Sequence, residues 1–390
     1  MNVTFDVERP FTWDEHRERL ARARADMERQ DIDLLIVTSL QSYAYLFGVD
    51  LLSGAGLFQC TFIPREGDIV AIPWGGNMNL YEQSPLLAEL VPWSDFGTEI
   101  DIAKTVLQRF GKVRRIGFET THSSLPLLLS MQILRMLEEQ DAQVIAPCDI
   151  VAQLRVRKSP TEVQVMRTAA KILDETFTAA FEAMRPGQRE CDVAAAALHA
   201  SYSAGGDHCI QPPLITSGIN TFKHTFSSPS RRVLQRGEIL VYEGGASFYR
   251  YHAVAAHSVI VGAEPSRQQR DAYRLAREII EAGCEMIRPG MLTSDIARVC
   301  IDRHRPHSER KGACHGYSIG LGYGDIWYDQ LVIDENDPSV LEEGMVLTIF
   351  GSADCGEEGW VLSVDPILVT GAGFERLTTI DPSELRAAGL

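Results

Sequence analysis

The chain has 390 residues and a formal net charge of −16, and hydrophobic residues make up 45% of it. This length predicts two or three domains, and the excess of acidic residues disfavours nucleic acid or an anionic membrane surface as the main partner. There is no apolar run of the roughly 18 residues that a membrane span needs, and the N-terminal sequence lacks the basic start and apolar core of a signal peptide.

The eight cysteines are scattered along the chain and show no CxxC spacing. In a chain of this size, such cysteines are expected to be reduced and mostly buried. Together with the missing signal-peptide pattern, they predict a cytoplasmic protein.

Helix and strand patterns alternate over the first part of the chain. Residues 13–30 place apolar residues at helical spacing with charges between them, and the apolar run at 32–39 predicts a buried strand. This alternation predicts an α/β domain over residues 1–154. Further strand patterns occur at 57–64, 68–74, 114–120 and 143–147, and helical patterns occur near 99–110 and 124–139.

A second unit begins near residue 155 with a clear helix start. Ser159 can cap the helix, Pro160 fits its first position, and Glu162 completes a capping box. The helix is expected to end at the RPG sequence 185–187.

The same pattern returns 103 residues later in the chain. A helix expected over about 266–286 ends at a second RPG sequence, 288–290, and in each copy an Asp five residues after the Gly opens a further helical stretch. This repeat implies an internally duplicated domain with pseudo-twofold symmetry. The alternative is two unrelated helices with similar ends.

Strand patterns follow each copy of the helical unit, and the longest of them reads as a wide hairpin. The predicted fold class is therefore α/β, of the α+β kind, with long helices covering a strongly curved antiparallel sheet in a domain of residues 155–390. The strand patterns lie at 214–220, 238–262, 345–352, 359–370 and 374–378.

Several motifs follow one another in a specific order over residues 157–370. Besides the two RPG helices, they are RKSPTEVQVMRTAAKI (157–172), SGIN (217–220), LEEGMVLTI (341–349) and ILVT (367–370). With these motifs the chain resembles the superfamily of methionine aminopeptidase, prolidase and creatinase. The resemblance implies the pita-bread fold for the second domain, and a first domain like the one that precedes this fold in creatinase and prolidase.

The positions of the metal ligands depart from this superfamily. Its metallopeptidases bind two metal ions through two Asp, one His and two Glu. Aromatic and aliphatic side chains cannot assemble such a site, so the resemblance implies the fold but argues against metal-dependent peptide hydrolysis, and no metal or other cofactor is expected. The matching positions hold Glu243, Val254, Tyr317, Phe350 and either Val364 or Ser363.

The likeness extends to metal-free members of the superfamily. Creatinase uses a His placed as His224 is here, in SGINTFKHTF. Bacterial ectoine hydrolases have motifs similar to EGGA (243–246), RYH (250–252) and GYSIGLGY (316–323). The chain departs from their pattern at Ala246, where a Gly is usual, and at His257 and Ser258, which follow Ala256 and stand where an Arg-Thr pair is usual. These changes leave the identity of the substrate open.

Two residues are candidates for the catalytic chemistry. Glu243 lies in an apolar strand, where a buried carboxylate needs either a partner or a function. The resemblance implies that it is the nucleophile, which would form an acyl-type intermediate; the alternative is an ion pair with Arg250 across the hairpin. His224 suits proton transfer to a ring nitrogen and from water, and its alternative is a surface position.

Candidate substrate-binding residues surround these two. Tyr317 is expected to bind a substrate carboxylate or to orient His224, and Asp365 to face a cationic amidine or to cap a turn. His252 is expected to face the pocket with Glu243, whereas His257, an odd number of residues away, should face the other side. The remaining candidates are Tyr251, from the RYH motif, and His315, beside the glycine-rich turn; a non-standard metal site from Glu243, His252 and His315 is an alternative.

The first domain contributes a candidate as well. Tyr45, Phe58 and Gln59 occupy the region that creatinase-type dimers insert into the pocket of the neighbouring subunit. The resemblance therefore implies a homodimer with Tyr45 at the partner's site. Simple strand packing is the alternative.

These features together predict a metal-independent, homodimeric hydrolase that opens a C–N bond in a small nitrogenous solute. An ectoine-type cyclic amidine is the favoured substrate. Creatine, another amidine or a sulfonium compound on the same machinery are alternatives. Another alternative is a binding module that has kept the fold without activity. A residual Xaa-Pro metallopeptidase is the last alternative, and Val254 and Phe350 argue against it because they stand at metal-ligand positions.

Overall fold

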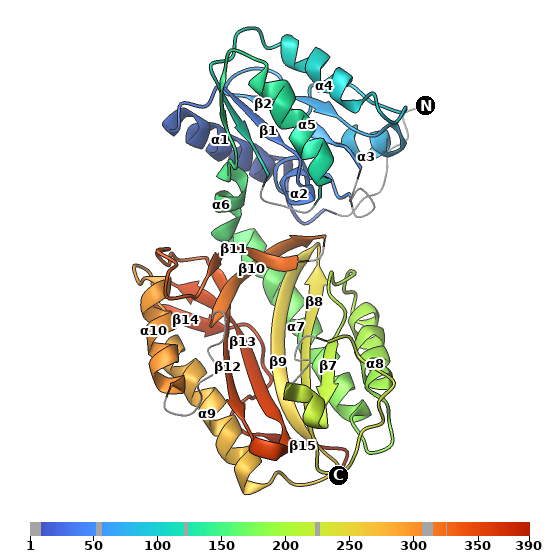
Figure 1. Ribbon diagram of the computed structural model, residues 1–390, viewed down its shortest axis with the longest axis vertical. Coiled ribbons are helices and arrows are strands. Elements are labelled where there is room, and N and C mark those ends of the chain that lie inside the picture. Colours follow the sequence, from blue (N-terminus) through green and yellow to red (C-terminus); the bar gives the residue numbers. More distant parts are fainter. Residues whose placement is uncertain (1–8, 52–56, 121–123, 223–226, 306–314, 325) are drawn as a thin grey trace. The chain divides into compact units, whose positions relative to one another are not determined.

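A computed structural model of the chain describes residues 9–51, 57–120, 124–222, 227–305, 315–324 and 326–390. The chain divides into two compact units, Met1–Arg155 with Tyr323–Asp325, and Val156–Gly322 with Ile326–Leu390 (Figure 1). The boundary expected after residue 154 lies one residue from this division.

The first unit is built on a mixed six-stranded sheet in the order β4-β3-β2-β1-β5-β6. Strand β1 pairs antiparallel with β2 and parallel with β5, and all four of its residues are buried, as its continuous apolar sequence predicts. Helices separate most of the strands along the chain, whereas β2 is followed directly by its antiparallel neighbour β3. The strands are β1 (Leu34–Val37), β2 (Cys60–Pro64), β3 (Val70–Ile72), β4 (Glu89–Leu90), β5 (Arg115–Phe118) and β6 (Gln143–Ile145), and the helices are α1 (Trp13–Arg29), α2 (Leu40–Phe47), α3 (Met78–Tyr81), α4 (Glu99–Gln108), α5 (Leu127–Glu138) and α6 (Ile150–Val156).

The second unit has a nine-stranded sheet whose main path runs β11-β10-β12-β13-β9-β8-β7, with long helices against it (Figure 1). The α/β fold class with a pita-bread second domain is confirmed. The helices are α7 (Pro160–Ala183), α8 (Glu190–Ser203), α9 (Arg267–Cys284) and α10 (Thr293–His304). The strands are β7 (Leu214–Ser217), β8 (Ile239–Phe248), β9 (Tyr251–Val261), β10 (Gly316–Tyr323), β11 (Ile326–Val332), β12 (Val346–Asp354), β13 (Trp360–Thr370), β14 (Gly373–Arg376) and β15 (Arg386–Ala388).

The sheet order reflects the duplication that the sequence predicts. The strands β10, β12 and β13 on one side mirror β7, β8 and β9 on the other, so a pseudo-twofold axis falls between β13 and β9. Helix α7 packs with α8, and α9 packs with α10. Both RPG turns end in a Gly with a left-handed φ of 90°, a conformation that other residues adopt only with strain.

Capping boxes start the long helix of each half. In α7, Ser159 accepts from the backbone of Glu162 while the Glu162 carboxylate accepts from the backbone of Ser159, as expected. Ser266 and Gln269 form the same arrangement at α9. The repeat is therefore seen in the capping boxes at the N-termini of α7 and α9 as well as in the sheet topology.

The β8–β9 hairpin defines the two faces of the sheet. Its two-residue turn places Tyr249 and Arg250 in the left-handed region, which suits a tight hairpin. Tyr242 lies opposite His257 in the ladder, and both rings pack on Phe177 of α7. We call this helix-covered side the outer face and the opposite side the inner face; Glu243, adjacent to Tyr242, therefore lies on the inner face.

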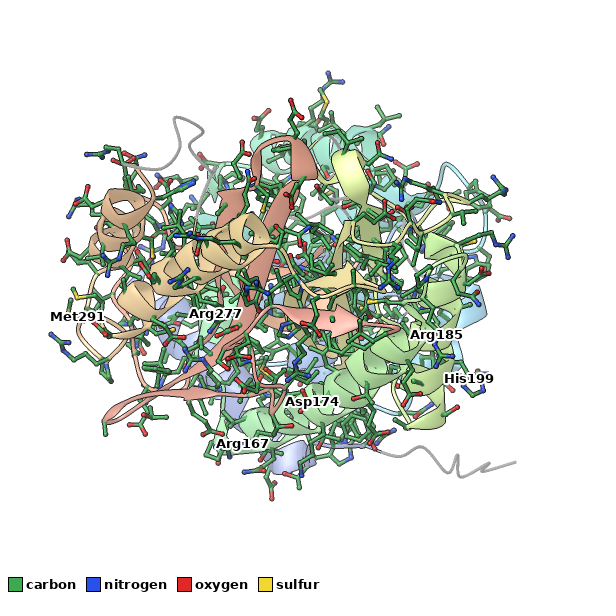
Figure 2. All side chains as sticks on the ribbon, turned by 90° about the horizontal axis from the view of Figure 1, so that it is seen from below. Arg167, Asp174, Arg185, His199, Arg277 and Met291 are labelled. Atoms are coloured by element: carbon green, nitrogen blue, oxygen red, sulfur yellow. The ribbon has the colours of Figure 1, made fainter. Side chains whose placement is uncertain are left out.

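Ion pairs join the outer helices to the C-terminal strands of the second unit, through Arg167 of α7 and Arg277 of α9, which are labelled in Figure 2. Arg277 of α9 donates to both carboxylate oxygens of Asp365 on β13, at 2.7 and 2.8 Å. Arg167 of α7 pairs with Glu375 of β14 at 2.7 Å. The helix layer and the sheet are thus joined by directional contacts in addition to apolar packing.

The described residues bear on two further expectations. No helix among them is both long and apolar enough to cross a membrane. The seven described cysteines are free thiols, and five of them are buried. Burial raises the pKa of several of these thiols, so they are poor nucleophiles at neutral pH.

Candidate active site

The positions that hold metal ligands in the resembling metallopeptidases come together on the inner face. Glu243 lies opposite Ala256 on β9, and Ala256 lies opposite Val364 on β13, which in turn pairs with Phe350 on β12. The same alternation places Val254 on this face as well. The register thus extends across β8, β9, β13 and β12 and joins residues far apart in the sequence.

The register also decides between the two candidates for the last ligand position. Ser363 lies on the outer face, where its hydroxyl accepts from Arg277 at 2.9 Å. Val364 therefore occupies the inner-face position. With Tyr317 on β10, the five positions offer one carboxylate, a phenol and three hydrocarbon side chains, which do not fit two metal ions. Within the described residues, no group of three or more His, Cys, Asp or Glu side chains is placed to hold a metal.

Glu243 is a buried carboxylate with only 3% of its surface exposed. Among the described residues its Oε2 has no hydrogen-bond partner. Burial without compensation disfavours the charged form and raises the pKa of the carboxyl to about 7. The alternative of an ion pair with Arg250 is not observed; the backbone N–H of Arg250 donates to Asp207, and Arg250 belongs to the hairpin turn.

Aromatic side chains line the inner face near Glu243. The indole N–H of Trp327 on β11 donates to the hydroxyl of Tyr317 at 3.1 Å. The ring of Tyr317 lies 6.2 Å from the ring of Phe350, between centroids. The indole lies against Gly245, where an added Cβ would come within 3.0 Å of the ring. Because Gly245 is two residues from Glu243, the aromatic group and the carboxylate share one face of the sheet.

His252 is on the inner face but has no free nitrogen. Its Nε2 accepts from the backbone N–H of Ile210 at 3.3 Å, and its Nδ1 lies 2.8 Å from the carbonyl oxygen of Arg250. Burial lowers its pKa to about 4, so the ring is neutral at neutral pH. We interpret His252 as a residue that positions the 210 segment and not as a proton carrier.

Two predicted binding residues lie on the outer face instead. The hydroxyl of Tyr251 donates to Glu162 at 2.7 Å, within the capping arrangement of α7. Asp365 accepts from Arg277 and from Arg376, and these guanidinium groups hold the pKa of its carboxyl below the usual value despite burial. Both side chains have partners that explain them without a substrate, and we leave them out of the proposed site.

His257 and His315 lie on opposite faces of the sheet. His257 points to the outer face, where its ring packs edge-on against Phe177. His315 is buried, stacks on Phe350 with ring centroids 6.3 Å apart, and thus borders the inner-face aromatic group. Burial lowers its pKa. His224 lies outside the described residues.

Tyr45 lies in the core of the first unit. It is fully buried, its ring packs against the guanidinium of Arg19, and its hydroxyl accepts from Arg22 and donates to the carbonyl of Leu154. Phe58 and Gln59 are buried as well. The alternative of packing within the domain therefore describes these three residues, and a side chain so enclosed does not reach a partner's pocket.

Sequence reasoning missed Trp327 and Gly245. Gly245 lies in the EGGA motif, and the absence of a side chain beside a buried carboxylate is the signal that could have indicated it. The strand register also shows on which face of the sheet the departures from the ectoine-hydrolase pattern lie. Ala256 lies on the inner face, whereas Ala246 and His257 face the helices.

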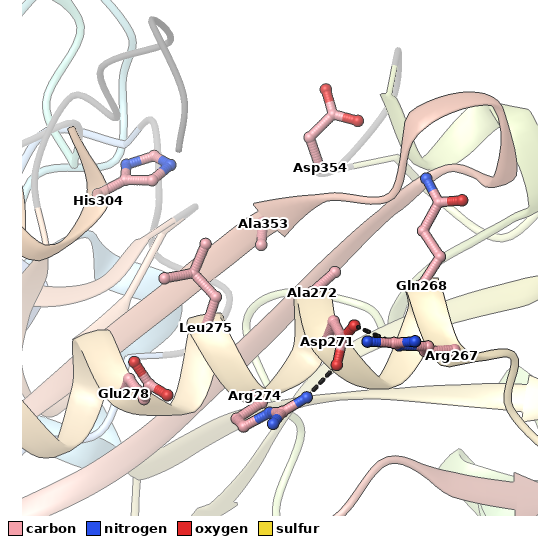
Figure 3. A pocket seen from close by; sticks show the side chains of 10 residues that line it. All are labelled: Arg267, Gln268, Asp271, Ala272, Arg274, Leu275, Glu278, His304, Ala353 and Asp354. Atoms are coloured by element: carbon pink, nitrogen blue, oxygen red, sulfur yellow. Dashed lines mark hydrogen bonds and ion pairs between the residues drawn. The ribbon is translucent and has the colours of Figure 1, made fainter. Parts of the chain in front are cut away.

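A separate cavity of about 660 Å³ lies over α9 (Figure 3). Asp271 in this lining pairs with both Arg267 and Arg274. None of the predicted site residues is among its described lining residues, which are Arg267, Gln268, Asp271, Ala272, Arg274, Leu275, Glu278, His304, Ala353 and Asp354.

Comparison with known proteins places this chain in a family. The model of metallopeptidase family M24 matches residues 164–380, more than half of the chain, and the model of the creatinase/prolidase N-terminal domain matches residues 19–157. The chain belongs to metallopeptidase family M24. It is thus a protein of a hydrolase family and carries that family's two-domain fold.

Relatives within M24 differ in what they act on. An ectoine hydrolase of Halomonas elongata is 27% identical, with 95% of this chain and 97% of the relative aligned. A Xaa-Pro dipeptidase of Pyrococcus horikoshii is 24% identical over 93% of this chain and 97% of the relative. The structure of a prolidase from Thermococcus sibiricus superposes with a TM-score of 0.84 at 21% identity, covering 95% of this chain and 99% of that one, and this likeness concerns the fold alone.

Proposed function

We propose that this M24 protein is a metal-independent hydrolase that opens a C–N bond in a small nitrogenous solute, with an ectoine-type cyclic amidine as the favoured substrate. The observation that carries the proposal is the buried Glu243 carboxylate, whose Oε2 has no partner among the described residues. A buried carboxylate of this kind is costly unless it has a function. The similarity to an ectoine hydrolase over nearly the whole chain supports the substrate class.

Glu243 can act as a nucleophile on an amidine. One carboxylate oxygen forms a bond to the amidine carbon, one C–N bond breaks, and the departing nitrogen takes up a proton. Water then adds to the same carbon and releases the carboxylate, which leaves an amide and a free amine. We propose His224 as the group that moves these protons, by the resemblance to creatinase.

The charge of the substrate suits this carboxylate. An amidinium is a cation, and a cation held beside Glu243 favours the ionised form that attack requires. A pKa near 7 in the free protein means that the nucleophilic form is depleted as the pH falls below that value. Turnover per bound substrate is therefore expected to decline in acid.

The test is turnover of ectoine by the purified chain and by Glu243→Gln. We expect the wild type to release a primary amine and the variant to lose at least 1000-fold in rate, as is typical when a nucleophile is removed. Far-ultraviolet circular dichroism should show the same fold for both. Creatine and Xaa-Pro dipeptides with added Mn²⁺ serve as alternative substrates, and turnover of either instead of ectoine would contradict the substrate assignment.

A binding module is the second candidate function. It is favoured by the contacts of His252, which leave no histidine nitrogen of that residue free for proton transfer beside Glu243. Tight ectoine binding by the wild type without product formation would support this candidate and contradict hydrolysis.

We further propose that the protein acts in the cytoplasm as a homodimer. The enclosed position of Tyr45 means that such a dimer would complete its sites by other residues. Light scattering on the purified chain measures this oligomeric state directly.

A further inference from the structure

We infer that Trp327 makes the inner-face site selective for a compact, flat organic cation over its neutral analogue. The inference deepens the proposed function and rests on it, since it concerns the same site. It adds a residue that the motifs do not indicate and a basis for discrimination by charge.

The position of the indole beside the strand of Glu243 supports this inference. Trp327 is almost fully buried, yet its ring lies against the backbone of Gly245, two residues along the strand from Glu243. The sulfur of Cys209 lies at the same place, 3.0 Å from where a Cβ at Gly245 would be. Any larger side chain at position 245 would displace the ring, so Gly245 is what allows an aromatic surface beside the carboxylate.

A hydrogen bond fixes the orientation of the indole. Its N–H donates to the Tyr317 hydroxyl, which leaves the faces of the rings as the interacting surfaces. Tyr317 in turn packs against Phe350 and Tyr328, with ring centroids 6.2 and 5.6 Å apart. Four aromatic rings therefore form one continuous group, anchored at the position where the metallopeptidases of this family hold a metal-binding His.

Charge distinguishes such a cation from its neutral analogue. Aromatic faces attract cations, and the attraction grows when the site is desolvated. Glu243 adds a buried negative charge that has no partner for its Oε2 among the described residues. A flat cation satisfies both features at once, because its plane can stack on a ring while an N–H donates to the carboxylate. A neutral molecule of the same shape gains the stacking but not the charge interaction.

The experiment compares binding of two ligands of similar shape. The protonated cyclic amidine 2-methyl-1,4,5,6-tetrahydropyrimidine carries the charge, and the cyclic urea tetrahydro-2-pyrimidinone is neutral. Binding of each is measured by calorimetry to the wild type, Trp327→Leu and Trp327→Phe. The matched control is Trp360→Leu, which removes an indole from the far end of β13.

We expect Trp327→Leu to weaken binding of the cation about tenfold or more, consistent with the strength of a desolvated cation–aromatic contact. Binding of the neutral ring should change little, and Trp327→Phe should fall between wild type and Trp327→Leu. Ligand-induced quenching of tryptophan fluorescence should disappear in Trp327→Phe, which provides a second measurement if the Leu variant does not fold. Trp360→Leu should bind like the wild type.

Equal losses for the cation and the neutral ring, or no loss for the cation, would overturn the inference. The readout is binding, so its failure is distinguishable from failure of the proposed function. Turnover of ectoine without charge-selective binding would support the hydrolase proposal and overturn the role of Trp327. Charge-selective binding that depends on Trp327, without turnover, would support the role of Trp327 and contradict the hydrolase proposal.

Discussion

Glu243 lies among apolar and aromatic side chains, where the ionised carboxylate loses the water that would solvate it. This burial raises its pKa from 4.5 to about 7 in the folded protein. The folded state therefore holds this proton more tightly than the unfolded chain does. A protonated Glu243 contributes stability that is fully present below pH 4.5 and is lost as the pH rises through about 7.

This linkage predicts a pH-dependent difference between the wild type and Glu243→Gln. The variant lacks the titration, so its free energy of unfolding relative to the wild type should rise between pH 5 and pH 8, by about 2 to 3 kcal/mol if the full shift is realised. Urea denaturation at both pH values measures it. Parallel profiles would mean that the carboxylate is compensated in the folded protein, which would contradict its uncompensated burial.

Alternation along β9 shows what sequence reasoning could and could not place. The odd separation of His252 and His257 predicts opposite faces, and the register confirms it. The same alternation puts Tyr251 outside, although it adjoins His252 in a motif. Motifs group residues that are adjacent in sequence, whereas a strand directs neighbours to opposite sides.

Asp365 shows that sequence patterns do not predict contacts between residues far apart in the chain. Its partner Arg277 lies 88 residues away on α9, and no local pattern reveals that pairing. Trp327 was missed for a similar reason, since its contact with Gly245 joins β11 to β8, two strands at opposite sides of the sheet order. The elements themselves, the capping boxes and the repeat were predictable because their signals are local or periodic.

At the scale of elements, the duplication makes the site asymmetric. The pseudo-twofold axis between β13 and β9 relates Glu243 on β8 to Phe350 on β12, at the two ends of the row through Ala256 and Val364. One half of the repeat thus contributes a carboxylate and the other a phenyl ring. The proposed flat cation would pair with the carboxylate and stack on the ring.

The contact between α9 and β13 predicts a structural role for Asp365. Asp365→Asn leaves Arg277 buried beside a neutral amide, and breaking a buried pair in this way costs about 3 to 5 kcal/mol. The melting temperature should fall while the KM for substrate stays unchanged, since the side chain faces the helices.

The exposed pair Arg298 and Asp295 provides the matched control, because Asp295→Asn removes a surface ion pair worth at most about 1 kcal/mol. A raised KM in Asp365→Asn at unchanged stability would instead support the substrate-binding role that the sequence suggested.

At the scale of the whole molecule, acidic residues are abundant but are not placed where the family needs them. The chain has 53 Asp and Glu residues, yet only one of the five ligand positions holds a carboxylate. The net charge of −16 is therefore a property of the surface, where it favours approach of cationic solutes.

This distribution predicts that the purified protein contains only substoichiometric divalent metal and that dialysis against a chelator leaves ectoine turnover unchanged. Elemental analysis and rate measurements before and after dialysis test both points, with a Xaa-Pro dipeptidase of family M24 treated in parallel. Activity that is lost to the chelator and returns with Mn²⁺ or Zn²⁺ would contradict metal independence.

The spread of the ligand positions over five strands has an evolutionary consequence. Recovering a dinuclear site would require changes at Val254, Tyr317, Phe350 and Val364 in addition to Glu243. Each change alone would put an unpartnered polar group among buried neighbours at a cost of about 1 to 3 kcal/mol, out of a total stability of about 5 to 15 kcal/mol. The benefit of coordination arrives only with the complete set, so the intermediate sequences are disfavoured. Stepwise acquisition of a metal site is therefore disfavoured by stability, and substitutions around Glu243 and its aromatic neighbours are the more accessible route to a new specificity.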